Sequence, residues 1–182
     1  GHVLVAGGAR GLTGAPGLTA TAAMRAGAGY VTVCVPDSLN DIFEIKLTEV
    51  MSRACPASDG HLDPGAAEAV LAATERAAAV ALGPGLGRWD GAPELVAGVA
   101  AGVEVPLVID ADGLNALIAR LGSLRERSNA TVLTPHEGEL GRLLETESAQ
   151  VRASRLESAR QAAERSGAIV VLKGDDSIVV HP

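Results

Sequence analysis

Five short apolar segments of this chain end in turns that carry glycine, aspartate, histidine or lysine, and these turns hold the residues that could do chemistry. They are residues 7–11, 83–87, 110–115, 134–139 and 173–177. In an α/β sheet, ligands bind outside the carboxyl ends of the strands, often at a helix N-terminus. If the apolar segments are parallel strands, the turns share one edge of one sheet, and we expect the active site there.

The turn at residues 134–139 reads Thr-Pro-His-Glu-Gly-Glu and opens a predicted helix. His136 lies at this position, whereas His2, His61 and His181 lie at an end or in loops. We expect His136 to contact a ligand through hydrogen bonds, because no serine or cysteine partner for nucleophilic attack is evident. Glu139 lies on the same helical turn. A purely structural histidine is the alternative.

The turn at residues 173–177 reads Lys-Gly-Asp-Asp-Ser and follows a continuous apolar segment, 168–172. A lysine beside an exposed glycine backbone suits nucleotide phosphates or a ribose. Asp175 and Asp176 suit ribose hydroxyls or a metal ion better than bare phosphate. A simple hairpin turn is the alternative reading.

The two remaining turns with strong signals are rich in glycine and in acidic residues. In Gly-Pro-Gly-Leu-Gly at 83–87, backbone N–H groups could approach a phosphate, although Arg88 stands where a dinucleotide fingerprint has its third glycine. Asp110, Asp112 and Asn115 could face hydrated Mg²⁺ or substrate hydroxyls. The alternatives are a structural glycine turn and an aspartate that only caps a short helix.

Composition limits the class of protein. The chain has 182 residues, 47% of them hydrophobic but only 2% aromatic, so its core must be aliphatic, as in buried parallel sheets. The formal net charge is −7 without a basic cluster, which argues against nucleic acid or an anionic membrane as a partner. Without a signal peptide or a long apolar span, and with two cysteines that lack metal-site spacing, we expect a cytoplasmic protein.

Strands and helices are predicted to alternate almost throughout, which favours right-handed βαβ units in one domain over residues 1–182. The expected strands are 3–6, 30–35, 49–53, 77–82, 106–109, 130–134, 168–172 and 177–180. The pattern also predicts a helix capped by Thr13, a loop at 56–63, a short helix that ends at Arg120, and one helix with its apolar face at positions 149, 153, 156, 159 and 163.

Taken in order, the motifs resemble those of the ADP/ATP-dependent NAD(P)H-hydrate dehydratase family, a family of metabolite-repair enzymes in the ribokinase-like superfamily. The motifs are Gly-Gly…Gly-Leu-Thr-Gly-Ala, Gly-Pro-Gly-Leu-Gly, Asp-Ala-Asp-Gly-Leu-Asn, Thr-Pro-His-Glu-Gly-Glu and Val-Leu-Lys-Gly, and together they cover nearly the whole chain. The resemblance implies an α/β fold, namely a ribokinase-like three-layer sandwich with a central, mostly parallel sheet flanked by helices.

The resemblance also implies an activity. ADP or ATP, with Mg²⁺, would phosphorylate the ring hydroxyl of the S-epimer of NADH or NADPH hydrate, and elimination of phosphate would restore NAD(P)H. By position, the hydrate would contact Ala15, Gly85 and His136, with Asp112, Asn115 and Glu139 as supporting residues. The nucleotide would lie along Lys173, Gly174, Asp175, Asp176 and Ser177. The family further implies a homo-oligomer.

This sequence departs from the family pattern at several points. Glu137 stands where the family usually has proline, and Asp175-Asp176-Ser177 stands where it usually has Ala-Gly-Thr. Residues 1–182 also lack the Gly-Thr-Gly-Asp segment that supplies the family's anion hole and catalytic aspartate. We therefore expect a chain truncated at both ends, with its catalytic aspartate beyond Pro182 and no turnover on its own.

Two alternatives stay open, one in the same superfamily and one from another class of protein. One is a ribokinase-like kinase for a vitamin precursor such as hydroxyethylthiazole, whose product would keep its phosphate. The other is a catalytically silent nucleotide-binding or interaction module.

Overall fold

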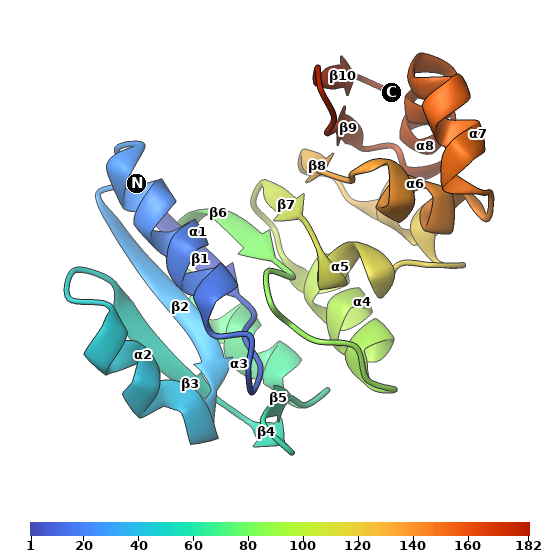
Figure 1. The fold of residues 1–182 in the computed structure, drawn as a ribbon. Coiled ribbons are helices and arrows are strands. Elements are labelled where there is room, and N and C mark those ends of the chain that lie inside the picture. The colour runs from blue at the N-terminus through green and yellow to red at the C-terminus, as the bar shows by residue number, and fades with distance from the viewer.

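The computed structural model describes residues 1–182 and shows one large sheet flanked by helices (Figure 1). The sheet has eight strands in the order β10-β9-β8-β7-β6-β1-β2-β3, all parallel except β10. Its strands are β1 His2–Ala6, β2 Tyr30–Pro36, β3 Met51–Cys55, β6 Ala77–Leu82, β7 Leu107–Ile109, β8 Thr131–Leu133, β9 Ile169–Leu172 and β10 Ile178–Val180. The expected mostly parallel α/β sandwich is confirmed.

The helices connect these strands and cover them. They are α1 Gly14–Arg25, α2 Asn40–Lys46, α3 Ala66–Ala73, α4 Ala92–Gly102, α5 Asp112–Asn115, α6 Glu137–Leu144, α7 Ser148–Ala153 and α8 Arg155–Ser166, with 3-10 helices at Asp37–Leu39 and Leu121–Glu126. β9 and β10 form an antiparallel hairpin around the turn at residues 173–177, as one reading of that turn predicted.

The order of the strands creates a switch point between β1 and β6. From β1 the chain moves outward through β2 to β3, then returns to place β6 on the other side of β1 and continues outward to β9. The connections that follow β1 and β6 therefore run toward opposite edges of the sheet. Such a reversal opens a crevice at the carboxyl ends of the two central strands, where α/β proteins bind ligands.

Alternating residues of the central strands pack on opposite faces of the sheet. Leu4 and Ala6 of β1 belong to a core of 35 buried residues. Val5 lies in a second core of seven buried residues with Phe43 of α2, the single phenylalanine of the chain. Because β-branched and small aliphatic side chains fill both faces, the helices can pack closely on a sheet that has almost no aromatic residues.

Several local predictions were wrong. Residues 56–63 are not a simple loop but contain a hairpin of β4 Ala57–Ser58 and β5 His61–Leu62. Thr13 precedes α1 but makes no side-chain cap, since its backbone is itself helical (φ −68°, ψ −12°); its hydroxyl oxygen accepts a hydrogen bond from Lys46 Nζ at 2.7 Å. The helix predicted to end at Arg120 ends at Asn115.

The single helix predicted over residues 149–163 is also wrong, because the chain forms two helices there. The chain breaks at Ser154 (φ −142°, ψ 53°), so α7 and α8 are separate helices, and Leu156 at the start of α8 is 46% exposed. A hydrophobic period can continue across a break of this kind, so the pattern alone did not reveal it.

None of the helices has both the length and the apolar character that crossing a membrane would require.

The buried histidine of β1 leads to a prediction about pH. His2 is 8% exposed, its Nε2 lies 2.9 Å from Thr32 Oγ1, and its ring stacks on Tyr30. Burial lowers the pKa of His2 below its ordinary value of 6.5. The unfolded chain therefore binds this proton more readily, so the free energy of unfolding should decrease as the pH falls below about 6.5, until the lower folded-state pKa is passed.

Urea denaturation at a series of pH values measures this effect, with His2→Gln as the comparison. The unchanged protein should lose more stability between neutral and mildly acidic pH than the glutamine variant does. Parallel pH profiles for the two proteins would show that His2 does not contribute.

Candidate active site

The five turns that were predicted to share an edge do share it. β1, β6, β7, β8 and β9 are consecutive parallel neighbours in the sheet, so their carboxyl-terminal turns lie next to one another. Backbone hydrogen bonds connect them. The Gly8 N–H donates to the Pro84 carbonyl at 3.1 Å, and the Lys173 N–H donates to the Pro135 carbonyl at 2.8 Å. The expected common edge is therefore confirmed.

The turn after β6 is packed so closely that two of its glycines have no space for a side chain. At Gly83 (φ +113°) a Cβ atom would lie 2.2 Å from the Asp110 carbonyl oxygen. At Gly85 (φ +62°) it would lie 2.4 Å from the Leu12 carbonyl oxygen and 3.4 Å from Ala15 Cβ. Ala15 and Gly85, two of the predicted hydrate contacts, are thus neighbours at the switch point.

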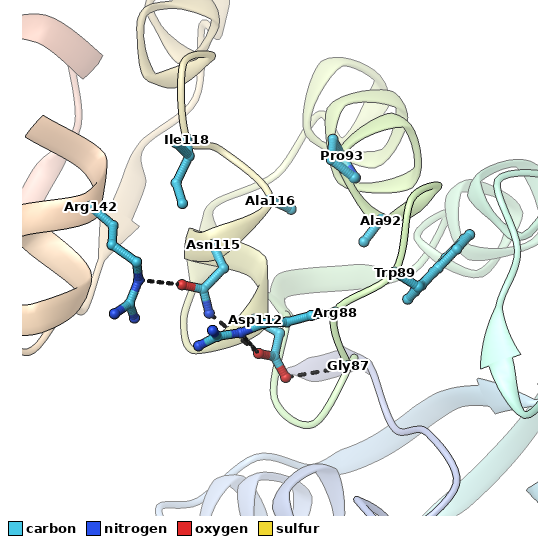
Figure 2. Close-up of a pocket in the computed structure, with 10 residues that line it drawn as sticks. All are labelled: Gly87, Arg88, Trp89, Ala92, Pro93, Asp112, Asn115, Ala116, Ile118 and Arg142. Carbon is cyan, nitrogen blue, oxygen red and sulfur yellow. Dashed lines mark hydrogen bonds and ion pairs between the residues drawn. The ribbon is translucent and has the colours of Figure 1, made fainter. Parts of the chain in front are cut away.

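Asp112 holds this glycine turn from the side (Figure 2). Its Oδ2 accepts a hydrogen bond from the Gly87 N–H at 3.0 Å, and Arg88 Nε lies 3.4 Å from Oδ1. Asn115 Nδ2 donates to Asp112 Oδ1 at 3.3 Å, and Asn115 Oδ1 accepts from Arg142 Nε at 2.9 Å. These residues line a cavity of about 180 Å³ and connect the turn after β6 to helix α6.

Neither Asp110 nor Asp112 caps α5, so the capping alternative is wrong. The residue between them, Ala111, has φ 54° and ψ −121°, a strained conformation for any residue other than glycine. The two carboxylates serve different neighbours: Asp112 binds the glycine turn and Asp110 binds Lys173. That these carboxylates face hydrated Mg²⁺ or substrate hydroxyls stays a prediction.

His136 has both a structural role and a partly exposed polar edge. Its Nδ1 accepts hydrogen bonds from the N–H groups of Gly138 (3.0 Å) and Glu139 (3.3 Å), while Glu139 Oε2 accepts from the His136 N–H at 2.9 Å. This reciprocal capping box begins α6. Because Nδ1 is an acceptor, the neutral ring carries its proton on Nε2. Nε2 lies 3.5 Å from Glu139 Oε1 and the side chain is 55% exposed, so a ligand that binds here would share this N–H with Glu139.

Lys173 connects three turns of the edge. Its Nζ lies 2.8 Å from Asp110 Oδ1 and 3.9 Å from Oε2 of Glu139, whose side chain is only 8% exposed. The lysine side chain is 42% exposed. It is therefore held in place by two carboxylates and still accessible to an anionic ligand.

A polar cavity of about 700 Å³ opens beside Lys173. Its lining residues are His136, Glu137, Gly138, Ser148, Arg152, Arg155, Lys173, Gly174, Asp175 and Asp176. Most of the predicted nucleotide residues are thus assembled around one space. Ser177 is not among the lining residues and is exposed at the far end of the turn.

The arginines of the two cavities were missed at the sequence level. Arg152 and Arg155 flank the break at Ser154, and Arg142 reaches Asn115 from α6. A hydrogen bond to Glu137 and the charge of that carboxylate raise the pKa of Arg152. The only available signal was the pair of arginines three residues apart, which on a continuous helix reads as an ordinary solvated face.

The polar cavity suits a phosphorylated ligand better than a metal ion alone. No group of three or more His, Cys, Asp or Glu residues is placed to hold a metal. Mg²⁺ commonly takes one or two protein carboxylates and completes its shell with water and nucleotide phosphates. Asp175 could supply such an oxygen, and Lys173 with two arginines could face the phosphates. The α6 N-terminus contributes less, because His136 already uses two of its N–H groups.

The fold defines the class of protein. A ribokinase-like superfamily protein from Enterococcus faecalis superposes with a TM-score of 0.80, at 23% identity, over 100% of this chain and 60% of its own. The ADP/ATP-dependent NAD(P)H-hydrate dehydratase from Bacillus subtilis, co-crystallized with ATP/Mg²⁺, gives a TM-score of 0.79 at 26% identity over 100% of this chain and 61% of its own. The chain thus has a ribokinase-like fold.

The sequence assigns the family within this class. The model of the NAD(P)H-hydrate dehydratase family matches residues 3–182, and the chain belongs to that family. A bifunctional NAD(P)H-hydrate repair enzyme, Nnr, from Moorella thermoacetica is 41% identical over 183 residues, which is 100% of this chain and 34% of that protein. The chain therefore spans about a third of the length of the curated relatives that it matches.

Proposed function

We propose that this chain forms the nucleotide- and substrate-binding part of an ADP/ATP-dependent NAD(P)H-hydrate dehydratase, which returns the S-epimer of NADH or NADPH hydrate to NAD(P)H. One observation carries the proposal. The turns after β1, β6, β7, β8 and β9 form one edge, with closely packed glycines at the switch point and, beside Lys173, a polar cavity lined by both cations and carboxylates. Family membership and the Bacillus subtilis dehydratase with ATP/Mg²⁺ support it.

In this proposal the switch point binds the hydrate, and the turn at Lys173 binds the nucleotide. The nicotinamide end of the hydrate binds at the switch point, where Ala15 is exposed beside the buried Gly85, and His136 Nε2–H donates to a polar group. Lys173 faces the phosphates, and the Gly174 backbone lies close to the nucleotide.

Asp112, Asn115 and Glu139 act indirectly. Asp112 and Asn115 hold the glycine turn, and Glu139 orients His136 and Lys173. The nucleotide with Mg²⁺, when bound, supplies the phosphoryl group that turns the ring hydroxyl into a leaving group.

The proposal extends to the context of the protein. We place it in the cytoplasm, as a homo-oligomer, with residues 1–182 forming a single domain. Cys34 and Cys55 are both buried free thiols, which supports a reducing compartment.

The test has a binding arm and a turnover arm. In calorimetry, residues 1–182 should bind ADP or ATP with Mg²⁺, and absence of binding would contradict the proposal. The gene product that carries this chain should convert NADH hydrate to NADH with release of inorganic phosphate. A stable phosphorylated product would instead identify a small-molecule kinase.

Residues 1–182 assayed alone should not turn over, because they contain no Gly-Thr-Gly-Asp segment to stabilise the transferring phosphate. Robust turnover by these residues would refute this expectation.

A further inference from the structure

Arg155 is the most enclosed cation of the polar cavity. It is the first residue of α8, and its side chain is 17% exposed, against 75% for Arg152 and 42% for Lys173. A Cβ atom added at Gly174 would lie only 2.3 Å from Arg155 Nη2. The loop after β9 therefore passes directly over this group, and a side chain at position 174 would displace it.

Two carboxylates already contact the guanidinium, one from the loop after β9 and one from α6. Nη1 forms an ion pair with Asp176 Oδ1, and Nη2 donates to the Asp176 carbonyl oxygen at 2.7 Å. Nε lies 3.4 Å from Glu137 Oε1 but makes no hydrogen bond, so it is a buried donor without an acceptor. Glu137 is shared, because its other oxygen accepts from Arg152 Nε at 2.8 Å.

Every cation that lines this cavity is therefore balanced by a carboxylate of the chain itself. Lys173 has Asp110, Arg152 has Glu137, and Arg155 has Asp176 and Glu137. A polyphosphate that enters the cavity must share these cations with the carboxylates or replace them. Asp176 is the easiest to replace, since its side chain is 81% exposed and exposed ion pairs are weak.

We propose that Arg155 is a phosphate-binding residue of the nucleotide site and that the Asp176 carboxylate holds its guanidinium until a ligand phosphate replaces it. This inference rests on the proposed nucleotide-binding function. An arginine suits the exchange because its planar fork pairs equally well with a carboxylate and with a phosphate. Asp176 thus weakens the binding of phosphorylated ligands while it keeps the buried cation paired.

Isothermal calorimetry with adenosine, ADP and ATP, each with Mg²⁺, tests the exchange. Asp176→Asn should lower the Kd of ADP and ATP by about two- to fivefold, the range expected for removal of an exposed ion pair, and leave the Kd of adenosine unchanged. Arg155→Gln should raise the Kd of ADP and ATP by about tenfold or more, because a charge-assisted hydrogen bond is lost. In the Arg155→Gln background, Asp176→Asn should have no further effect.

The control is Glu157→Gln, which removes a negative charge from the exposed start of the same helix, outside the cavity, and should leave all three affinities unchanged. If Arg155→Gln does not fold, Arg155→Lys keeps the charge but not the fork and should also weaken ADP and ATP binding. Weaker ADP and ATP binding by Asp176→Asn would overturn the inference, since Asp176 would then contact ribose or Mg²⁺.

Equal tightening by Glu157→Gln would overturn it as well, because the effect would then be one of net charge. If the unchanged chain binds no nucleotide, the proposed function fails. If it binds nucleotide and Asp176→Asn changes nothing, only the exchange at Arg155 fails.

Discussion

Replacing Gly83 with alanine is expected to lower the free energy of unfolding by about 4 kcal/mol, the sum of backbone strain and overpacking. Gly83 has φ +113°, where residues with a Cβ atom are strained, and the new methyl group would lie 2.2 Å from the Asp110 carbonyl oxygen and 2.6 Å from Gly113 N. Both contacts are to backbone, so no side-chain rotation can relieve them. Urea denaturation followed by circular dichroism measures the change.

Gly11→Ala is the matched control for this substitution. Gly11 also has a positive φ of +82°, but no atom lies within 4 Å of the position that its Cβ would take. Its replacement should therefore cost only the backbone strain, about 1–2 kcal/mol. Equal costs at the two positions would show that the turn after β6 is not held as tightly against the Asp110 turn as the coordinates indicate.

Replacing Lys173 with methionine is expected to weaken the binding of ADP and ATP by about ten- to a hundredfold, because a charge-assisted hydrogen bond to phosphate is lost. The ammonium group lies between Asp110 and Glu139 on the rim of the polar cavity, where it is held in place and is still accessible. Its removal also leaves those two carboxylates without their cation, which would further repel an anionic ligand. Calorimetric titration of the two proteins measures the loss.

Lys46 is the other lysine of the chain and provides the control. It lies at the end of α2 and donates to Thr13 Oγ1, outside the polar cavity. Lys46→Met removes the same charge and should leave nucleotide affinity within about twofold of the original, as expected for a screened surface charge. If both lysine variants lose affinity equally, the effect comes from net charge and Lys173 has no specific contact.

Much of the fold could be predicted because its signals are local. A buried parallel strand must be apolar on both faces, and the turn that follows must change direction, so apolar runs that end in glycine or aspartate mark both elements. The strand 168–172 was predicted on this basis and observed as Ile169–Leu172. The predicted helix through Ser154 failed because the apolar spacing continues across the break, where the backbone leaves the helical region.

The candidate site was predictable in its members but not in its pairings. His136 and Glu139 form a capping box within four residues, a local motif that sequence can reveal. The partners of Asp110 and Asp112 lie 63 and 25 residues away, at Lys173 and Gly87. Their closeness in sequence does not reveal that they bind different groups, and the residue between them, Ala111, has a positive φ of 54°.

The sequence by itself determined that strands would alternate with helices and that the polar turns would follow the strands, because burial and turn geometry act on neighbouring residues. Only the tertiary structure decided which cation meets which carboxylate. Arg155 reaches Asp176 across 21 residues and Glu137 across 18 because α8 packs against β9 and α6. Ion pairing depends on the distance between side chains in the folded chain, and helix packing sets that distance.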